Sequence, residues 1–263
     1  MFRKLTACDH DRVLPFLTRR PSQNLFLLGD IEAHGYDVPF QEVWGYIDDR
    51  GDVRTVLLRY FGSFIYSTET GEGSEEAVRI LSANTAWTLL QGDSLSLATF
   101  RKQAGYIPSR TREFHFAERK PGAPRPHIDT SLVQEATLDH VDALLQLRRT
   151  IVEFADSTTT RESLRQSIQS RTGLHYFVPG EAGELASAAS TVAENSLSAM
   201  VVGVCTRPLY RGQGYATQCV AKICETYDER GKRLCLFYDN PKAGEIYYRL
   251  GFQEIGGWTQ FYR

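Results

Sequence analysis

Residues 201–217 combine an apolar strand, a loop with glycines at alternate positions, and the start of an amphipathic helix. The loop glycines are Gly212 and Gly214, and the small Ala216 continues their spacing. Small residues let phosphate oxygens approach the backbone, while free N–H groups and the positive end of the helix face the same point. The segment predicts a phosphate or pyrophosphate site. The alternative is a plain strand–turn–helix in which the glycines serve only the turn.

Two other phosphate-binding patterns are excluded. The loop lacks the third glycine, and the acidic residue about 20 positions further on, that mark a dinucleotide-binding fold. No GxxxxGK[ST] occurs in the chain, so a nucleotide-hydrolysing site is not expected.

A second segment, residues 236–252, follows the first, and the order and spacing of the two segments are informative. It contains a strand, then Asn240, a helix, and the sequence Tyr247-Tyr248-Arg249-Leu250-Gly251-Phe252. An Arg-x-x-Gly-x-Ala loop before a helix, then a strand, Asn, helix and Tyr-x-x-x-Gly-Phe, resembles the core of the GNAT N-acetyltransferase superfamily. The resemblance covers about 130 residues and implies the acyl-CoA N-acyltransferase fold for the second half of the chain.

The resemblance also implies roles for individual residues. Acetyl-CoA would be the co-substrate, with its pyrophosphate on the backbone amides of residues 212–216 and its pantetheine arm along the strand at residues 201–204. Tyr247 would be the general acid that protonates the departing thiolate, and Tyr248 is expected to be the packed neighbour. The expected cofactor-binding residues are Val202, Val204, Arg211, Gly212, Gln213, Gly214, Tyr215, Ala216, Thr217, Asn240 and Lys242.

The general base is less well defined. An attacking amine must be neutral, whereas lysine-like amines have a pKa of about 10. Glu194 is our first candidate, with Glu184 and His175 behind it, and an ordered water is the alternative. Cys205 lies next to the expected cofactor strand, but a buried strand cysteine is usually inert, so direct transfer is expected.

Composition limits the remaining function classes. The chain has 263 residues, with 30 basic and 32 acidic side chains and a net charge of −2. That balance argues against a nucleic-acid partner, and no apolar run is long enough to span a membrane. Five cysteines without a CxxC pair suggest neither a metal site nor a disulfide framework. We expect a cytoplasmic, bacterial protein that is a monomer or homodimer.

Patterning along the chain predicts a mixed α/β (α+β) fold in two domains. Residues 118–127 hold three prolines and one glycine, which can sustain neither a helix nor a central strand. The prediction is therefore a first domain at 1–118, a linker at 119–129 and the catalytic GNAT domain at 130–263. Periodicity predicts helices over residues 9–18, 24–34, 75–82, 95–104, 139–151, 161–171, 214–230 and 242–250. It predicts strands over residues 53–60, 62–66, 86–90, 112–117, 131–136, 175–178, 185–194, 197–206 and 233–238, with a closing strand pair at 252–262 around Gly256-Gly257.

The first half has elements similar in length to those of the second, yet we find in it no counterpart of the loop at residues 211–216. Its glycine-rich stretch at residues 71–76 is acidic and would repel phosphate. We expect a degenerate GNAT-like domain that walls the acceptor pocket or holds the domain pair together; an unrelated α+β substrate domain is the alternative.

The expected activity is acetyl transfer from acetyl-CoA to a primary amine of a small molecule, an amino acid or a peptide. A non-catalytic acyl-CoA-binding regulatory protein, or transfer of another acyl or aminoacyl group, remains open. The acceptor is not specified: carboxylates at Asp139, Asp142, Glu153 and Asp156 could attract a cationic amine or simply form a solvated helix face.

Overall fold

A computed structural model describes residues 1–154 and 159–263, and it divides into two compact units. Unit 1 contains residues 1–117, 237–239 and 254–263, and unit 2 contains residues 118–236 and 240–253. Each unit has its own hydrophobic core, so the strands and helices of each are described by themselves.

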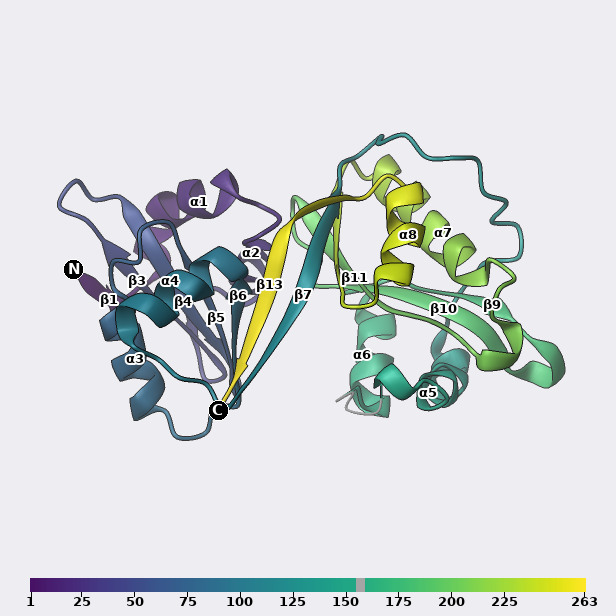
Figure 1. The fold of residues 1–263 in the computed structure, drawn as a ribbon, viewed down its shortest axis with the longest axis horizontal. Helices are drawn as coiled ribbons and strands as arrows, with labels where there is room; N and C mark the ends of the chain where they lie inside the picture. Colours follow the sequence, from purple (N-terminus) through teal and green to yellow (C-terminus); the bar gives the residue numbers. More distant parts are fainter. Residues whose placement is uncertain (155–158) are drawn as a thin grey trace. The chain divides into compact units, whose positions relative to one another are not determined.

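In chain order, the elements of the first half precede those of the second (Figure 1). The first half comprises β1 (Phe2–Lys4), α1 (His10–Arg19), α2 (Leu25–His34), β2 (Asp37–Val38), β3 (Gln41–Ile47), β4 (Val53–Tyr60), β5 (Ser63–Thr68), α3 (Ser74–Ala83), β6 (Leu89–Asp93), α4 (Ser94–Ala104) and β7 (Arg110–Arg119). The second comprises β8 (Gln134–Glu135), α5 (Val141–Arg149), α6 (Arg161–Ser170), β9 (His175–Pro179), β10 (Leu185–Val192), β11 (Ser198–Thr206), α7 (Tyr215–Glu229), β12 (Arg233–Tyr238), α8 (Pro241–Arg249) and β13 (Gln253–Tyr262).

The two halves repeat one element order and one pairing scheme. Strands β3, β4 and β5 pair antiparallel in sequence, and β5 then pairs parallel with β6. Strands β9, β10 and β11 do the same, and β11 pairs parallel with β12. Two helices precede each antiparallel set and one helix crosses over in each parallel step. The expected mixed α/β fold class is confirmed, and the chain contains two copies of it.

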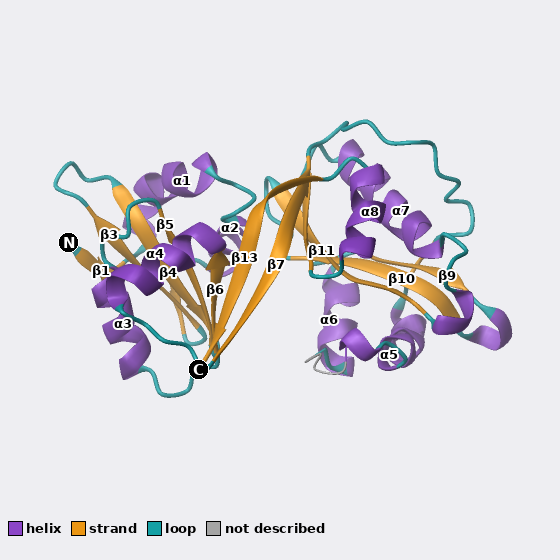
Figure 2. Ribbon diagram, viewed as in Figure 1, coloured by secondary structure: helices purple, strands orange, loops and turns teal. Residues whose placement is uncertain are grey.

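Helices cover both faces of each sheet. In unit 2, α5 and α6 lie on one face while α7 and α8 lie on the other (Figure 2). In unit 1, alternate residues of β4 enter different cores, because successive strand side chains point to opposite faces. Val56 and Leu58 pack with α1 and α2, whereas Leu57 packs with α3 and α4.

The last strand belongs to unit 1 although it follows the second series of elements. Residues 258–262 of β13 pair antiparallel with residues 89–93 of β6. Trp258 and Phe261, 0% and 3% exposed, are part of the unit 1 interior. The expected pair of closing strands at residues 252–262 is wrong, since β13 is one continuous strand. Gly257 serves close packing rather than a turn: a Cβ there would lie 2.5 Å from Ser94 Oγ.

Three further expectations needed correction. The strand β3 was not anticipated, although its residues alternate strictly between buried and half-buried. The strand expected at residues 86–90 is displaced to β6, because Trp87 instead packs in the core and donates its indole N–H to Leu81 O. The strand expected at residues 131–136 is reduced to β8.

The linker is anchored by one buried side chain. Arg119, 2% exposed, donates to Leu250 O at 2.8 Å and pairs with Asp228 at 2.5 Å. Gly251, at φ +88°, has no room for a side chain, since a Cβ would lie 2.7 Å from Pro124 O. The linker thus ties the end of α8 to α7 within unit 2.

Candidate active site

The loop between β11 and α7 has the backbone geometry expected of an anion site. Gly212 and Gly214 have φ values of +80° and +78°, and a Cβ on either would meet no atom within 4 Å. Both glycines are therefore needed for their left-handed backbone conformation and not to avoid a steric clash. Gly214 is the N-cap, α7 has no acidic residue in its first turn, and its ladder starts with Gln218 N–H to Gly214 O. The first N–H groups of the helix have no partner within it, so they can bind an anion.

The strand leading into this loop has an irregular middle. The β10–β11 register shifts between Ala188↔Cys205 and Ser190↔Val202, so β11 carries an extra residue there. Gly203 lies in this bulge at φ +63°. Parallel pairing with β12 spans only Ser198 to Met200 of β11. Beyond it, residues 202–204 are half-buried, so the main-chain edge of β11 can accept an extended ligand.

Helix α8 places the expected acid in an apolar setting. Asn240 caps the helix, its side chain accepting from Lys242 N–H at 3.0 Å. Tyr247 is 7% exposed and lies edge-on to Phe252, with ring centroids 5.9 Å apart. Burial raises the pKa of the Tyr247 phenol to about 12. Tyr248 is 46% exposed, so the expectation that it is the packed member of the pair is wrong.

Glu194 is held in an ion-pair cluster. Its carboxylate contacts Arg230 at 2.9 Å and Lys232 at 2.8 Å and accepts from Tyr227 Oη at 2.6 Å. Although burial opposes it, hydrogen bonds from Lys232 and Tyr227 and both cations leave the pKa of Glu194 lowered. Glu194 lies in the β10–β11 turn, at the opposite end of β11 from the glycine loop. This arrangement favours a structural role for Glu194.

The other two base candidates are also engaged. His175, 5% exposed, contacts Ser190 Oγ through Nδ1 and Ser167 Oγ through Nε2. Burial, followed by the charge of Arg148, lowers the pKa of His175 to about 4. Glu184 pairs with Arg207 at 3.3 Å and accepts a hydrogen bond from the Tyr210 hydroxyl. Arg207 is therefore partly neutralised, and Arg211 remains the exposed cation of the loop.

The part of the chain that contains the glycine loop and α8 matches a known protein family. Residues 141–252 match the acetyltransferase (GNAT) family. They form a GNAT acetyltransferase domain. The acyltransferase class of the GNAT domain is thereby established, in agreement with the resemblance seen in the sequence. A search of curated proteins finds no match.

Solved structures similar to the chain extend over both halves. A tandem GNAT protein from the clavulanic acid biosynthesis pathway is 15% identical with a TM-score of 0.61, covering 100% of this chain and 98% of that one. A GCN5-related N-acetyltransferase from Sphaerobacter thermophilus is 15% identical, TM-score 0.64, covering 100% and 95%. A Drosophila protein is 12% identical, TM-score 0.69, covering 99% and 98%. At these identities the likeness shows the fold, which is the tandem GNAT arrangement.

The repeat in unit 1 contains a loop that corresponds to the glycine loop of the GNAT domain, contrary to expectation. Gly71 and Gly73 both have φ +85°, and Gly73 is the N-cap of α3 as Gly214 is of α7. The space is filled, however: a Cβ on Gly71 would lie 2.2 Å from the Gln103 side chain. Gly71 N–H is bound by Thr68 Oγ1, and Glu75 and Glu76 occupy the first turn. The backbone conformation persists while the anion site is closed.

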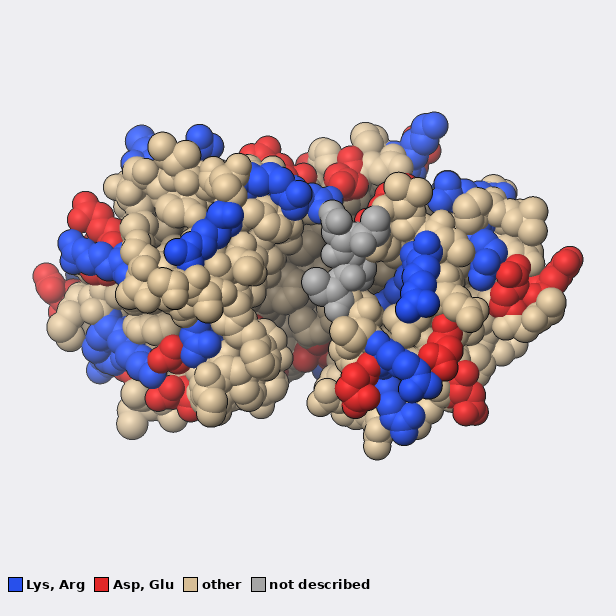
Figure 3. Space-filling view, turned by 90° about the horizontal axis from the view of Figure 1, so that it is seen from below, with Lys and Arg blue, Asp and Glu red and all other residues tan. Residues whose placement is uncertain are grey.

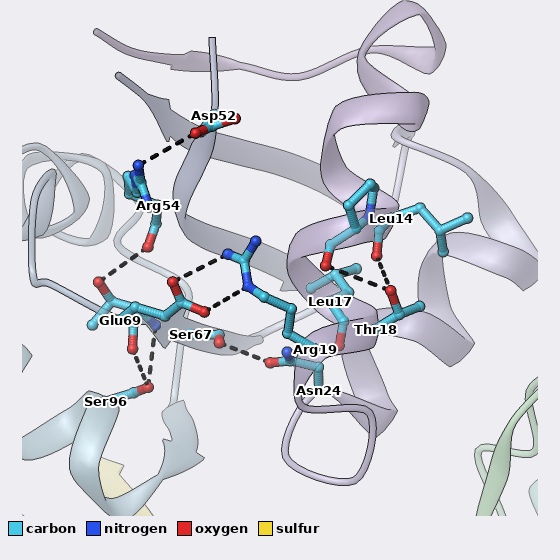
Figure 4. A network of polar contacts seen from close by, with 12 residues as sticks. Leu14, Leu17, Thr18, Arg19, Asn24, Asp52, Arg54, Ser67, Glu69 and Ser96 are labelled. Atoms are coloured by element: carbon cyan, nitrogen blue, oxygen red, sulfur yellow. Dashed lines mark hydrogen bonds and ion pairs between the residues drawn. The ribbon is translucent and has the colours of Figure 1, made fainter. Parts of the chain in front are cut away.

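The strand edge that is open in the GNAT domain is also closed in unit 1. Ser96 Oγ accepts from Thr68 N–H at 3.1 Å and donates to Thr68 O at 3.0 Å. Ser67 donates to Asn24 at 2.7 Å, and Arg19 pairs with Glu69 (Figure 4). Residues 64–68 of β5 are fully buried, whereas residues 202–204 of β11 are not. Only the second repeat offers its strand edge to a ligand.

Charged side chains of both signs are mixed on one face of the molecule (Figure 3). On the face shown in Figure 3, basic and acidic side chains are interspersed, and neither sign covers a continuous area. Within residues 1–154 and 159–263, no helix is both long and apolar enough to cross a bilayer. In the same residues, no three His, Cys, Asp or Glu side chains cluster in a way that could hold a metal ion.

Proposed function

We propose that the second repeat is an acetyl-CoA-dependent N-acetyltransferase that transfers the acetyl group directly to a primary amine of a small molecule, an amino acid or a peptide. The observation that carries this proposal is the half-buried edge of β11, which runs straight into an open loop of two left-handed glycines. The same features are closed in the first repeat, so the opening is not a by-product of the fold.

Each part of the domain then has a physical task. The N–H groups of residues 212–217 would bind the pyrophosphate, with Arg211 and Lys242 as exposed cations. The main chain at Val202 and Val204 would hydrogen-bond the pantetheine amides, as an added strand does. Acetyl-CoA, when bound, supplies the acyl group as an activated thioester. Tyr247 would donate a proton toward the sulfur. Because Glu194, Glu184 and His175 are engaged elsewhere, we assign no protein base.

The burial of Cys205 supports direct transfer. Its side chain is 5% exposed, and burial raises the pKa of the thiol to about 11, so almost no thiolate forms at neutral pH. We expect Cys205→Ala to keep kcat within about threefold of the wild type, because it removes a thiol that takes no part in the proposed reaction. Mass spectrometry after acetyl-CoA incubation should find no acetyl group on Cys205; an acetylated Cys205 with a dead alanine variant would contradict direct transfer.

The proposal is tested by thermal unfolding with acetyl-CoA. Ligand at about 100 times its dissociation constant adds roughly 2.7 kcal/mol, or about 5–10 °C for a domain of this size. Gly214→Glu should abolish this shift, because its carboxylate would face the pyrophosphate. Gly231→Glu is the matched control: it also sits at positive φ, +66°, in open space, but at the other end of α7. It should lose stability and keep the full shift.

Absence of any shift with acetyl-CoA or longer acyl-CoAs would overturn the assignment. A normal shift without CoA release in the presence of any amine would instead favour a regulatory acyl-CoA-binding protein.

A further inference from the structure

Arg148 is a half-buried cation of unit 2 whose guanidinium lies against β10 and β11. It lies near the end of α5, and its Nη2 donates to Ser190 Oγ on β10 at 3.3 Å. A Cβ on Gly203 would lie 3.0 Å from Nη2, so the guanidinium rests directly against the β11 bulge. Its Nε has no exposed surface and no hydrogen-bond partner.

Within residues 1–154 and 159–263, no opposite charge balances that of Arg148. No carboxylate among the described residues pairs with it, and its single hydrogen bond goes to a neutral hydroxyl. Burial accordingly lowers the pKa of Arg148. A buried charge without an opposite charge is costly, and proteins rarely keep one unless a ligand completes the pair.

The groups around Arg148 do not supply that opposite charge. His175 on β9 shares Ser190 with Arg148 and is held neutral. The Cys205 thiol on β11 is buried and protonated. Asp142, on the outer side of α5, is already paired with Arg161 of α6 at 2.7 Å. Arg149 beside it is exposed and adds positive charge.

Arg148 also lines a cavity. The cavity has a volume of about 820 Å³, and its wall includes Thr150, Ile151, Phe154 and Thr160. It is thus large enough for a small molecule. The wall also carries the exposed Arg149 and the Asp142–Arg161 ion pair, whose two charges offset each other. Water screens the charge of the exposed Arg149, which leaves the guanidinium of Arg148 to balance one unit of negative charge. Because a guanidinium binds planar oxyanions well, a carboxylate fits better than a phosphate dianion.

We propose that Arg148 binds a carboxylate of the amine acceptor, so that the acceptor class is an amino acid or a related amino carboxylate. This inference rests on the proposed N-acetyltransferase function and makes its substrate more specific. It replaces the idea that carboxylates attract a cationic amine: Asp142 is neutralised by Arg161, Asp139 and Glu153 are exposed, and Asp156 lies outside the described residues.

The test compares matched acceptors in a CoA-release assay. The 20 common L-amino acids and their primary carboxamides are assayed with acetyl-CoA, so each pair differs only in the carboxylate. We expect the best acid to exceed its amide in kcat/KM by about 10- to 100-fold, the range of a hydrogen bond to a charged group. Arg148→Gln should remove this preference while changing the amide rate by less than about threefold. Arg165→Gln, on the exposed face of α6, is the control and should preserve it.

Stability gives a second readout. Removing an unbalanced buried charge should leave the unfolding temperature unchanged or raise it, and Arg148→Lys should retain part of the acid preference. Equal loss for acids and amides, or a lowered unfolding temperature, would mean a structural role and overturn the proposal. The proposal would also be overturned if amides were as good acceptors as acids, or if Arg148 favoured the carboxylate of a succinyl-CoA donor and not that of the acceptor. The same holds if no free acid at 10 mM is turned over or stabilises the protein. If acetyl-CoA itself fails to stabilise the protein, the proposed function fails instead.

Discussion

Replacing Tyr247 by Phe is expected to lower kcat by about 10²- to 10⁴-fold, the usual contribution of a positioned general acid. Acetyl-CoA should still raise the unfolding temperature of this variant by the wild-type amount, because the substitution leaves the glycine loop and β11 untouched. Losing turnover while keeping cofactor affinity is the signature of a group that acts only as the reaction proceeds.

The environment of Tyr247 determines the pH dependence. Its pKa is raised from 10.0 to about 12, so the phenol keeps its proton throughout the neutral and mildly alkaline range. A lowered pKa would make the phenol a stronger acid, whereas burial raises its pKa. The raised pKa keeps the phenol protonated and so able to donate its proton. We expect no alkaline loss of kcat attributable to Tyr247 below pH 10. The measurement is a kcat–pH profile with the best acceptor of the amino-acid panel.

Tyr248→Phe is the matched control for this experiment. It removes the same hydroxyl one position away, from a side chain that is 46% exposed, and should change kcat by less than about twofold. Similar losses in both variants would indicate a general disturbance of α8, and a fully active Tyr247→Phe would remove the residue from the reaction.

The sequence indicates the site best where a backbone conformation, such as a positive φ or a helix N-cap, restricts which residue types can occur. Gly212 and Gly214 take positive φ, and Asn240 caps a helix, so the loop and the start of α8 could be located from residue types alone. Gly203 carried a similar signal, since an isolated glycine within a strand suggests a bulge. Apolar patterning alone predicts a regular strand over residues 201–204, so it gives no sign of the irregularity that exposes the strand edge.

Arg148 could not have been identified in this way. It lies in an ordinary amphipathic helix, and its distinction arises from what surrounds it: the bulge at Gly203, a neutral His175 and the absence of a carboxylate partner among the described residues. His175 and Gly203 lie 27 and 55 positions after Arg148 in the sequence (175 − 148 and 203 − 148), so no local sequence pattern specifies these contacts. The same holds for Glu194, whose two cationic partners come from the end of α7 and the residues after it.

The glycine stretch of the first repeat shows a different limit of sequence patterns. The charges of Glu72, Glu75 and Glu76 predict that it does not bind phosphate, but they do not indicate its backbone conformation. Charge is indeed what differs, but backbone conformation is shared: Gly71 and Gly73 have the left-handed geometry of Gly212 and Gly214. The Gln103 side chain and the acidic first turn of α3 therefore close this loop to an anion, while its backbone forms the same turn as in the second repeat.

The most destabilising single substitution we expect is Trp258→Ala in β13. Trp258 is 0% exposed, its ring centroid lies 4.9 Å from that of Phe237, and its indole N–H donates to Gln91 at 3.2 Å. Removing a fully buried Trp costs about 3–5 kcal/mol, through the transfer free energy and the cavity that remains. The loss should appear in unit 1, measured by denaturant unfolding followed by near-UV circular dichroism.

The effect extends beyond the Trp258 side chain, because β13 follows the second repeat in the chain but pairs with β6 of the first. Trp258→Phe should lose clearly less stability than the alanine variant, and a chain ending at residue 253 should leave β6 without its antiparallel partner. Acetyl-CoA should still stabilise unit 2 in the Trp258→Ala protein, since its glycine loop and strand edge lie in residues 198–217. A Trp258→Ala loss below about 1 kcal/mol would show that the aromatic core of unit 1 does not depend on the C-terminal strand. The expected pattern, damage in one repeat and an intact cofactor response in the other, would mean that the tandem is joined through folding while its chemistry stays in a single repeat.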